Sequence, residues 1–251
     1  MPLISIPWID ADAPFPSVET ALSNGLVAAG GDLSIARLLK AYQLGLFPWF
    51  NEGEPILWWS PNPRTVLRCD QFKLSKSLAK TARQVARSEF SASPKLRITT
   101  NLAFLRVMHQ CAQTRHHQEG TWISPEIIQA YYNLHLIQQA HSVEVWQGSE
   151  LVGGLYGVQL GRFFFGESMF SLINDASKMA LYYLTRYLMN THQIQYIDCQ
   201  QETAHLLSLG AQSIPRTEFT QLLKKSTSAD TTTWGQGQLC AEGRLHPLAP
   251  L

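Results

Sequence analysis

One stretch, Arg162–Ser171, limits what this chain can fold into more than any other. Its letters, RFFFGESMFS, place four phenylalanines and a methionine around a single carboxylate, Glu167. A segment this apolar predicts a buried strand, and burying a charge without a partner is expensive. Glu167 must therefore either pair with an arginine of the protein, such as Arg162 or Arg186, or face a cation that arrives as a ligand. The residues alone leave both readings open.

Length and pattern predict an α/β protein with a mixed sheet and two domains. Residues 1–63 are rich in Pro, Gly and Trp and predict a small aromatic domain with one helix at Ser34–Leu44. Residues 64–225 combine helical segments with an antiparallel meander from His141 onward, which predicts a sheet packed by helices. Residues 226–251 are mostly Ser, Thr, Gly, Gln and Pro, and we expect a flexible tail there.

The charges are divided unevenly along the chain. The net charge is only +1, but Arg64–Arg115 holds eleven Lys or Arg and two acidic residues. Within a predicted helix, Phe72–Arg87, the basic residues recur every three or four positions and form one stripe. The stripe consists of Lys73, Lys76, Lys80, Arg83 and Arg87. Like charges at this spacing repel, so the stripe favours a nucleic-acid partner, with a solvated helix face as the alternative.

Two polar residues follow an apolar strand in IQYIDCQQ. Asp198 and Gln200 are two residues apart, so on a strand they point to the same side. A carboxylate beside an amide can orient the amide oxygen toward a proton donor. The alternative is that Asp198 or Gln201 caps a short helix that begins at Thr203.

Other motifs argue against several functions. The four cysteines and eight histidines lack metal-ligand spacing, so we expect no metal. The glycines of GGLYG are too strand-like to cradle a phosphate, and we expect no cofactor. The N-terminus lacks a signal-peptide pattern, and no apolar run is long enough to span a membrane. We therefore expect a cytoplasmic protein with no membrane partner.

Taken together, these segments resemble the bacterial leucyl/phenylalanyl-tRNA–protein transferases. The resemblance runs in one order from near residue 15 to about residue 220. The matching strings are GLVAAGGDLS, AYQLGLFPWF, ILWWSPNPR, TWI, AHSVEVW, LVGGLYGV, FFGESMFS, ASK, DCQ and HLLSLGA.

The resemblance implies an activity, a fold and partners. The family transfers leucine, phenylalanine and, less well, methionine from aminoacyl-tRNA to proteins that begin with Arg or Lys. This marks those proteins for degradation through the N-degron pathway. The larger domain is expected to have an N-acetyltransferase-like (GNAT) fold. Two readings remain as alternatives: an N-acyltransferase with another carrier, such as coenzyme A, and a non-catalytic RNA-binding protein.

The resemblance also assigns residues to the site. It places Glu167, Asp198 and Gln200 at the active site, and Lys76 and Lys80 in the tRNA-binding segment. Trp49 and Trp122 match aromatics that hold the aminoacyl end. We assign the other substrate contacts to Phe165, Met169, Phe170 and Ser171.

An aminoacyl ester is already activated, so the enzyme mainly has to bring it to the acceptor amine. Gln200, positioned by Asp198, would accept a hydrogen bond from the amine, and Glu167 would hold a substrate ammonium. Phe163–Phe165, Met169 and Phe170 would form an apolar pocket on one side of the strand. Which group accepts the proton stays open, and the ribose hydroxyl of the tRNA is a rival to both side chains.

Overall fold

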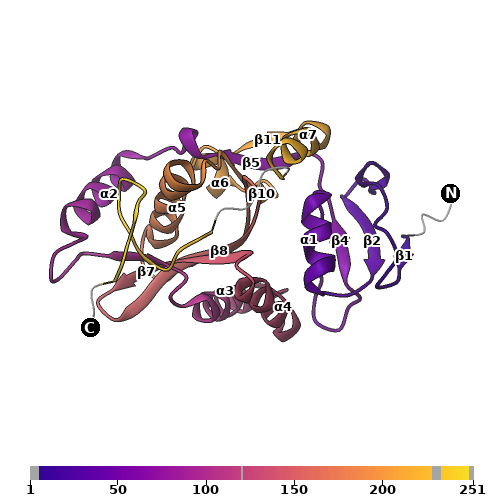
Figure 1. Ribbon diagram of the computed structural model, residues 1–251, viewed down its shortest axis with the longest axis horizontal. Coiled ribbons are helices and arrows are strands. Elements are labelled where there is room, and N and C mark those ends of the chain that lie inside the picture. Colours follow the sequence, from indigo (N-terminus) through magenta and orange to yellow (C-terminus); the bar gives the residue numbers. More distant parts are fainter. Residues whose placement is uncertain (1–5, 120, 228–232, 249–251) are drawn as a thin grey trace.

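A computed structural model describes residues 6–119, 121–227 and 233–248. The N-terminal part forms a small four-stranded sheet in the order β1-β2-β4-β3. Its strands are β1 (Trp8–Ile9), β2 (Leu26–Gly30), β3 (Phe47–Pro48) and β4 (Leu57–Trp59). Helix α1 (Ile35–Gln43) packs beside this sheet (Figure 1). The Ser34 side chain caps α1 by accepting a hydrogen bond from the backbone N–H of Arg37.

The rest of the chain builds a nine-stranded mixed sheet in the order β11-β5-β10-β9-β8-β7-β6-β12-β13. The strands are β5 (Arg64–Arg68), β6 (Arg97–Thr100), β7 (Ala140–Gln147), β8 (Glu150–Leu160), β9 (Phe163–Ser171), β10 (Tyr196–Gln200), β11 (Gln212–Ile214), β12 (Gly237–Leu239) and β13 (Leu245–His246). Strands β9 and β10 pair in parallel, and the neighbouring pairs β8–β9 and β5–β10 are antiparallel. The α/β class with a mixed sheet is confirmed.

Helices cover both faces of this sheet (Figure 1). One face carries α2 (Lys76–Ser88) and α5 (Ala176–His192), and the other carries α3 (Phe104–Glu119) and α4 (Pro125–Leu136). The short α6 (Ala204–Ser208) follows β10, and α7 (Arg216–Thr227) packs against α1 and β9. The second face shares one apolar core with α1, so the small sheet and the large one meet at this core. None of the described helices combines the length and apolar character needed to cross a membrane.

A β-bulge in β9 decides where the carboxylate points. Gly166 pairs with Gly157 and Ser168 pairs with Tyr156, so Glu167 is the extra residue between them. A bulge of this kind interrupts the alternation of a strand and re-aims side chains at the insertion. The regular alternation of a strand is therefore interrupted at the position that carries the charge.

The close approach of two strands at this bulge requires glycine. A Cβ atom on Gly157 would lie 2.2 Å from the carbonyl oxygen of Phe165 and 2.6 Å from the Phe164 ring. We therefore expect Gly157→Ala to lower the free energy of unfolding by about 1–3 kcal/mol, as overpacking does. Gly166→Ala is the matched control, because its Cβ would have no neighbour closer than 3.4 Å. Urea unfolding of both variants checks this, and equal midpoints for the two would contradict it.

Two predictions about segment ends are wrong. Helix α2 begins at Lys76, and Lys73 precedes it, with its backbone N–H bonded to Leu209. The Ser75 hydroxyl caps the helix at that point. The expected flexible tail is also wrong for residues 233–248, where β12 extends the large sheet and Trp234 is buried. The few apolar side chains of residues 233–248 are enough to cover the edge of the large sheet. Residues 228–232 and 249–251 lie outside the described part of the chain.

Candidate active site

A cavity of about 310 Å³ lies where the bulge of β9 meets the small N-terminal sheet. Its wall combines side chains from β3, β8, β9, β10, α5 and α6 with Trp49 and Trp122. Glu167 is the acidic residue in this wall. The volume is at the lower end of the range of about 300–1,000 Å³ that is usual for small-molecule sites.

Glu167 is held by three neutral donors and by no cation. The hydroxyls of Tyr42 and Tyr131 donate to its two carboxylate oxygens at 2.8 Å and 2.9 Å. The side-chain amide of Gln200 donates to Oε1 at 3.0 Å. Among the described residues, the ion pairs use other acids, namely Asp198, Asp70 and Asp175. The arginine-paired alternative from the sequence is therefore wrong for this part of the chain.

Burial raises the pKa of Glu167 to about 7, because the surrounding protein disfavours the charged form. The hydrogen bonds from Tyr42, Tyr131 and Gln200 act in the opposite direction, and the nearby Asp198 charge adds to the increase. The pKa values of the two tyrosines rise well above their usual value for the same reason of burial. Glu167 can therefore change its charge near neutral pH.

This shift predicts a pH dependence of stability. The folded protein binds the Glu167 proton more tightly than the unfolded chain, whose value is near 4.5. The contribution of Glu167 to the free energy of unfolding should therefore fall as pH rises from 4.5 to about 7, by at most about 1.4 kcal/mol per pH unit. Other groups also titrate there, so the difference between wild type and Glu167→Gln isolates this residue. A difference that rises or stays flat in urea unfolding would contradict the assignment.

Asp198 lies outside the cavity wall and is paired within the protein. Both of its oxygens accept hydrogen bonds from Arg64, at 2.8 Å and 2.6 Å, and both side chains are fully buried. Asp198 Oδ1 also accepts the backbone N–H of Gln200 at 2.9 Å. The helix-cap alternative is wrong, because the Thr203 hydroxyl caps α6. Asp198 thus holds the backbone of Gln200 in place and does not touch its side chain.

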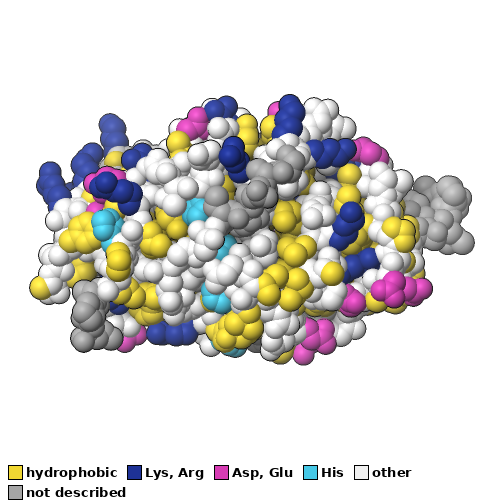
Figure 2. Space-filling model, in the orientation of Figure 1, with side chains coloured by type: hydrophobic (Ala, Val, Ile, Leu, Met, Phe, Trp, Pro, Cys, Tyr) yellow, Lys and Arg dark blue, Asp and Glu magenta, His cyan; other side chains and the backbone are white. Residues whose placement is uncertain are grey.

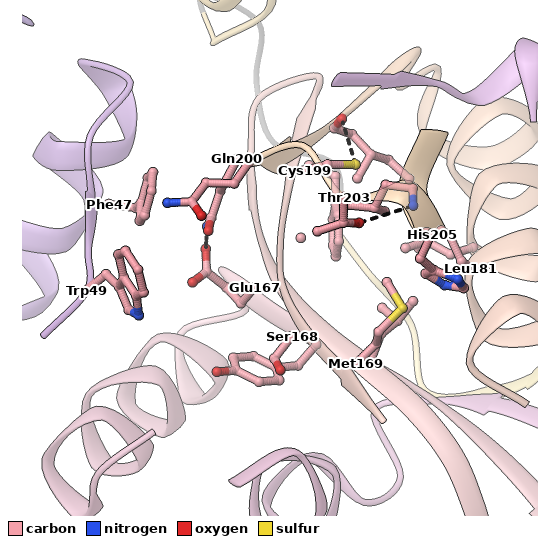
Figure 3. A pocket seen from close by; sticks show the side chains of 18 of the residues that line it. Phe47, Trp49, Glu167, Ser168, Met169, Leu181, Cys199, Gln200, Thr203 and His205 are labelled. Atoms are coloured by element: carbon pink, nitrogen blue, oxygen red, sulfur yellow. Dashed lines mark hydrogen bonds between the residues drawn. The ribbon is translucent and has the colours of Figure 1, made fainter. Parts of the chain in front are cut away.

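Gln200 leaves the strand in an unusual backbone conformation. Its φ is +62°, and the pairing of β10 with β5 shifts register between Asp198 and Gln200. A non-glycine residue with positive φ is uncommon, and such residues gather at functional sites. The turn takes Gln200 out of strict alternation with Asp198 and brings its amide to Glu167 (Figure 3).

The cavity has two chemically different ends (Figure 3). Glu167 and Gln200 lie near Phe47 and Trp49 at one end, and Met169 and Leu181 lie toward the other. Cys199, Thr203 and His205 lie on the side of Leu181 (Figure 3). The wall also includes the apolar residues Leu155, Phe164, Leu184, Ile197 and Leu206. A charged group and an apolar group of one ligand can therefore be bound at the same time.

The structure separates the phenylalanines of β9. Phe164 and Met169 face the cavity, but Phe165 and Phe170 are buried in the core shared with α1 and do not line the cavity. The expectation that these rings share one side of the strand is wrong, because side chains alternate along a strand. Ser171 is also outside the cavity wall; its hydroxyl bonds to Ile173 and Ser177 at the start of α5.

Trp49 and Trp122 line the cavity, as expected for substrate contacts. Other residues of the site had no clear signal in the sequence. Tyr42 and Tyr131 were missed, because they are 125 and 36 residues from Glu167. The cavity also contains Cys199, Thr203 and His205, which are shown in Figure 3. A helix that places a hydroxyl on its buried face is the only hint that the sequence offers for the tyrosines.

The basic stripe is present on α2 and faces solvent. Lys76, Lys80, Arg83 and Arg87 are exposed, while Leu78, Ala82 and Val85 pack against the sheet side. Figure 2 shows Lys and Arg side chains projecting where Figure 1 places α2. Lys73 is exposed in the segment before the helix.

The described residues also include a small group of potential metal ligands, Glu89, Cys240 and Glu242, within 4.8 Å of one another. Glu89 already accepts hydrogen bonds from Tyr183 and from the backbone of Ala241. We assign no metal to this group, which is separate from the cavity wall.

The mixed α/β fold surrounds a cavity that holds one carboxylate with a perturbed pKa, an arrangement typical of enzyme sites. Residues 66–224 match the family described as leucyl/phenylalanyl-tRNA protein transferase, and residues 31–62 match its N-terminal domain. The chain therefore belongs to the leucyl/phenylalanyl-tRNA protein transferase family. The family and the enzyme that the sequence predicts are confirmed.

Individual relatives agree with this family. A leucyl/phenylalanyl-tRNA–protein transferase of Bordetella bronchiseptica is 51% identical over 249 residues and covers 98% of both chains. One from Nitrosomonas eutropha is 55% identical over 86% of this chain and 89% of its own. A solved protein of unknown function from Bacteroides thetaiotaomicron is 15% identical, with a TM-score of 0.41 over 68% of this chain and 56% of that chain.

Proposed function

We propose that this chain transfers leucine, phenylalanine and, less readily, methionine from aminoacyl-tRNA to the α-amine of proteins that begin with Arg or Lys. The product would be marked for degradation through the N-degron pathway. The observation that carries the proposal is the two-ended cavity of a chain in this family. One end includes the apolar side chains of Met169 and Leu181, which suit an unbranched or γ-branched side chain, and the other holds a carboxylate that suits an ammonium.

The chemistry needs little activation. The acceptor is an α-amine with a pKa of about 7.7–8.0, so a fraction of it is free base at neutral pH. The ester is already reactive, and holding the two groups together supplies much of the rate. In this proposal, Trp49 and Trp122 hold the aminoacyl end, and the oxygen of Gln200 orients the attacking amine. Asp198 is a positioning residue, because it acts through the backbone of Gln200.

The tRNA would contact the basic face of α2. Phosphate contacts release counterions, so each lost contact lowers the slope of log K against log salt by about 0.9 for duplexes. We expect Lys76→Ala with Lys80→Ala to weaken tRNA binding and to reduce this slope by about 1–2. The matched control replaces the exposed Lys40 of α1 and Lys224 of α7. Filter binding at several salt concentrations checks this, and equal slopes in both double variants would mean that α2 is only a solvated face.

Three further assignments belong to the same proposal. The domain boundary lies near residue 63, between the small sheet and the first strand of the large one. The large sheet is of N-acetyltransferase-like type, which the parallel pair β9–β10 in a mainly antiparallel sheet supports. The protein acts in the cytoplasm, where aminoacyl-tRNA and new N-termini are available.

A transfer assay tests the activity. Labelled Leu-tRNA is incubated with a peptide that begins with Arg, and with the same peptide beginning with Asp as the control. The proposal predicts label in the Arg peptide only, and loss of that label when ribonuclease destroys the tRNA beforehand. Label in neither peptide with folded protein would refute the activity, and equal label in both would refute the acceptor specificity.

A further inference from the structure

Four oxygen atoms, two from the Glu167 carboxyl group and one each from Tyr42 and Tyr131, form a closed ring beside the cavity. Tyr42 Oη lies 2.8 Å from Glu167 Oε1, and Tyr131 Oη lies 2.9 Å from Glu167 Oε2. The two tyrosine hydroxyls lie 2.5 Å from each other. Both tyrosines are fully buried in the core and are absent from the cavity wall, whereas Glu167 opens into it. The ring therefore reaches substrate through the carboxylate alone.

Counting protons shows which form of the ring this geometry represents. Three O–H···O contacts need three protons, because oxygens this close repel unless a proton lies between them. Two tyrosines supply two protons. With an ionised carboxylate, one of the three contacts always lacks a proton. The third proton can only come from Glu167 in its carboxylic acid form.

The donors fix the position of that proton. Glu167 Oε1 already accepts from Gln200 Nε2 at 3.0 Å and from Tyr42. In the acid form, the added proton therefore sits on Oε2 and is donated to Tyr131, which reverses the donation from Tyr131 in the ionised form. Tyr131 then donates to Tyr42, and Tyr42 still donates to Oε1. Such head-to-tail rings are strengthened by mutual polarisation. The three contacts, at 2.5 Å, 2.8 Å and 2.9 Å, can all hold a proton only in this proton-loaded form of the site.

We propose that Glu167 is the proton acceptor of the transfer reaction, and that Tyr42 and Tyr131 are positioning residues whose hydroxyls close a ring around the accepted proton. This rests on the proposed function, because the proton is that of the acceptor's ammonium. It assigns the role that the sequence left open between two side chains and the ribose hydroxyl. The pKa of Glu167, raised by burial to about 7, suits a group that must release this proton to water between turnovers.

The groups around Glu167 leave it free to titrate. The titratable or charged side chains come from several elements: Tyr42 on α1, Tyr131 on α4, Tyr156 on β8, Asp198 on β10 with Arg64 on β5, and His205 on α6. Asp198 is neutralised by Arg64, and burial lowers the pKa of His205, which favours its neutral form. No described cation bonds to Glu167 and fixes it in the ionised form.

The step balances as follows. The ionised Glu167 takes one proton from the acceptor ammonium, so an N–H bond breaks and an O–H bond forms at Oε2. The free amine attacks the ester carbonyl carbon, and a C–N bond forms. The ester C–O bond then breaks, and the ribose oxygen takes one of the two protons on the nitrogen, which became positively charged on attack; the other proton stays as the amide N–H. The products are an amide, a ribose hydroxyl and a protonated Glu167, which returns its proton to water.

Infrared difference spectroscopy of the protein alone tests the ring. The signal is the carboxylic acid band that is present in wild type and absent in Glu167→Gln. We expect this band near pH 6, with a midpoint of loss near the pKa of about 7. The double variant Tyr42→Phe/Tyr131→Phe removes two charge-assisted donors, so its midpoint moves to higher pH. The control Tyr183→Phe removes a hydroxyl from a different buried carboxylate, Glu89, and leaves the midpoint unchanged.

A wild-type band that is absent at pH 6 would overturn the proposal, as would a midpoint that does not move in a folded double variant. Should the double variant fail to fold, the wild-type titration still decides, because it needs no tyrosine substitution. The infrared experiment uses no tRNA. A wild-type protein that shows the carboxylic acid band but transfers no leucine would therefore refute the proposed function and leave the hydrogen-bonded ring intact.

The pH profile of transfer supplies the catalytic readout. A reaction that needs a carboxylate and an ammonium gives a bell-shaped kcat/KM, with its descending limb near the amine pKa of about 7.7–8.0. Glu167→Gln can use only free amine, so its descending limb disappears and its rate rises through that range. The Tyr42→Phe/Tyr131→Phe variant should keep a bell-shaped profile, with its ascending limb moved to higher pH. If the two tyrosines had only a structural role, their loss would lower the rate equally at every pH. A descending limb that persists in Glu167→Gln would overturn the proposal.

Discussion

Replacing Asp198 by alanine should lower the free energy of unfolding by about 3–5 kcal/mol. The substitution leaves the guanidinium of Arg64 without a charge partner at 0% exposure. The remaining partners of Arg64 are the carbonyl oxygen of Gly45 at 3.1 Å and the rings of Phe47 and Phe219. These neutral groups cannot offset the loss of a bidentate carboxylate in a dry core. Urea unfolding measures the effect.

A second ion pair of the same chain provides the control. Arg68 and Asp70 also meet at 2.8 Å, but their side chains are 44% and 46% exposed. Asp70→Ala should therefore change stability by less than about 1 kcal/mol, because water replaces the lost partner. Equal losses in the free energy of unfolding for Asp198→Ala and Asp70→Ala would show that burial does not make the Arg64–Asp198 pair more important for stability than an exposed pair.

Glu167→Gln should lower kcat for leucine transfer by about 10²–10⁴-fold, the usual contribution of a positioned acid or base. Glutamine keeps the size of the side chain and can still bond to Tyr42 and Tyr131, but it cannot take up a proton. The loss should therefore appear in a protein that folds normally. Single-turnover rates with preformed Leu-tRNA and an Arg-starting peptide measure it without interference from product release.

Glu144→Gln is the matched control for this loss. Glu144 is also a fully buried carboxylate in the large sheet, bonded by Thr99 and Ser142, but it lies outside the cavity wall. Its substitution should leave the transfer rate per folded molecule within a few-fold of wild type. Similar losses in both variants would mean that any disturbance of a buried carboxylate harms the enzyme, and Glu167 would lose its special role.

The sequence predicts the parts of this site that depend on local chemistry. The apolar run of β9 predicts a buried strand, and the spacing of Lys76, Lys80 and Arg83 predicts a one-sided basic helix. The charge of Glu167 in that strand marks the position where a functional group is to be expected. These inferences need only neighbouring residues, whose geometry within a helix or strand is fixed by the backbone.

What failed depends on contacts between distant segments. The bulge at Glu167 arises from the pairing of β8 with β9, which the sequence does not reveal. The single pocket expected from Phe163–Phe165, Met169 and Phe170 failed because their side chains alternate between the cavity and the core. The pairing of Asp198 with Arg64 joins residues that are 134 positions apart. A polar composition suggested a flexible tail, but Trp234 and the backbone pairing of β12 with β6 order residues 233–248.

The most direct test of the central claim combines the activity and the site in one measurement. A peptide that begins with Arg is incubated with Leu-tRNA and either wild type or Glu167→Gln, and the product is sequenced by mass spectrometry. We predict one leucine added to the N-terminal α-amine by wild type, and far slower addition by a variant that folds equally well. No addition by folded wild type, or equal addition by both proteins, would contradict the role given to this cavity.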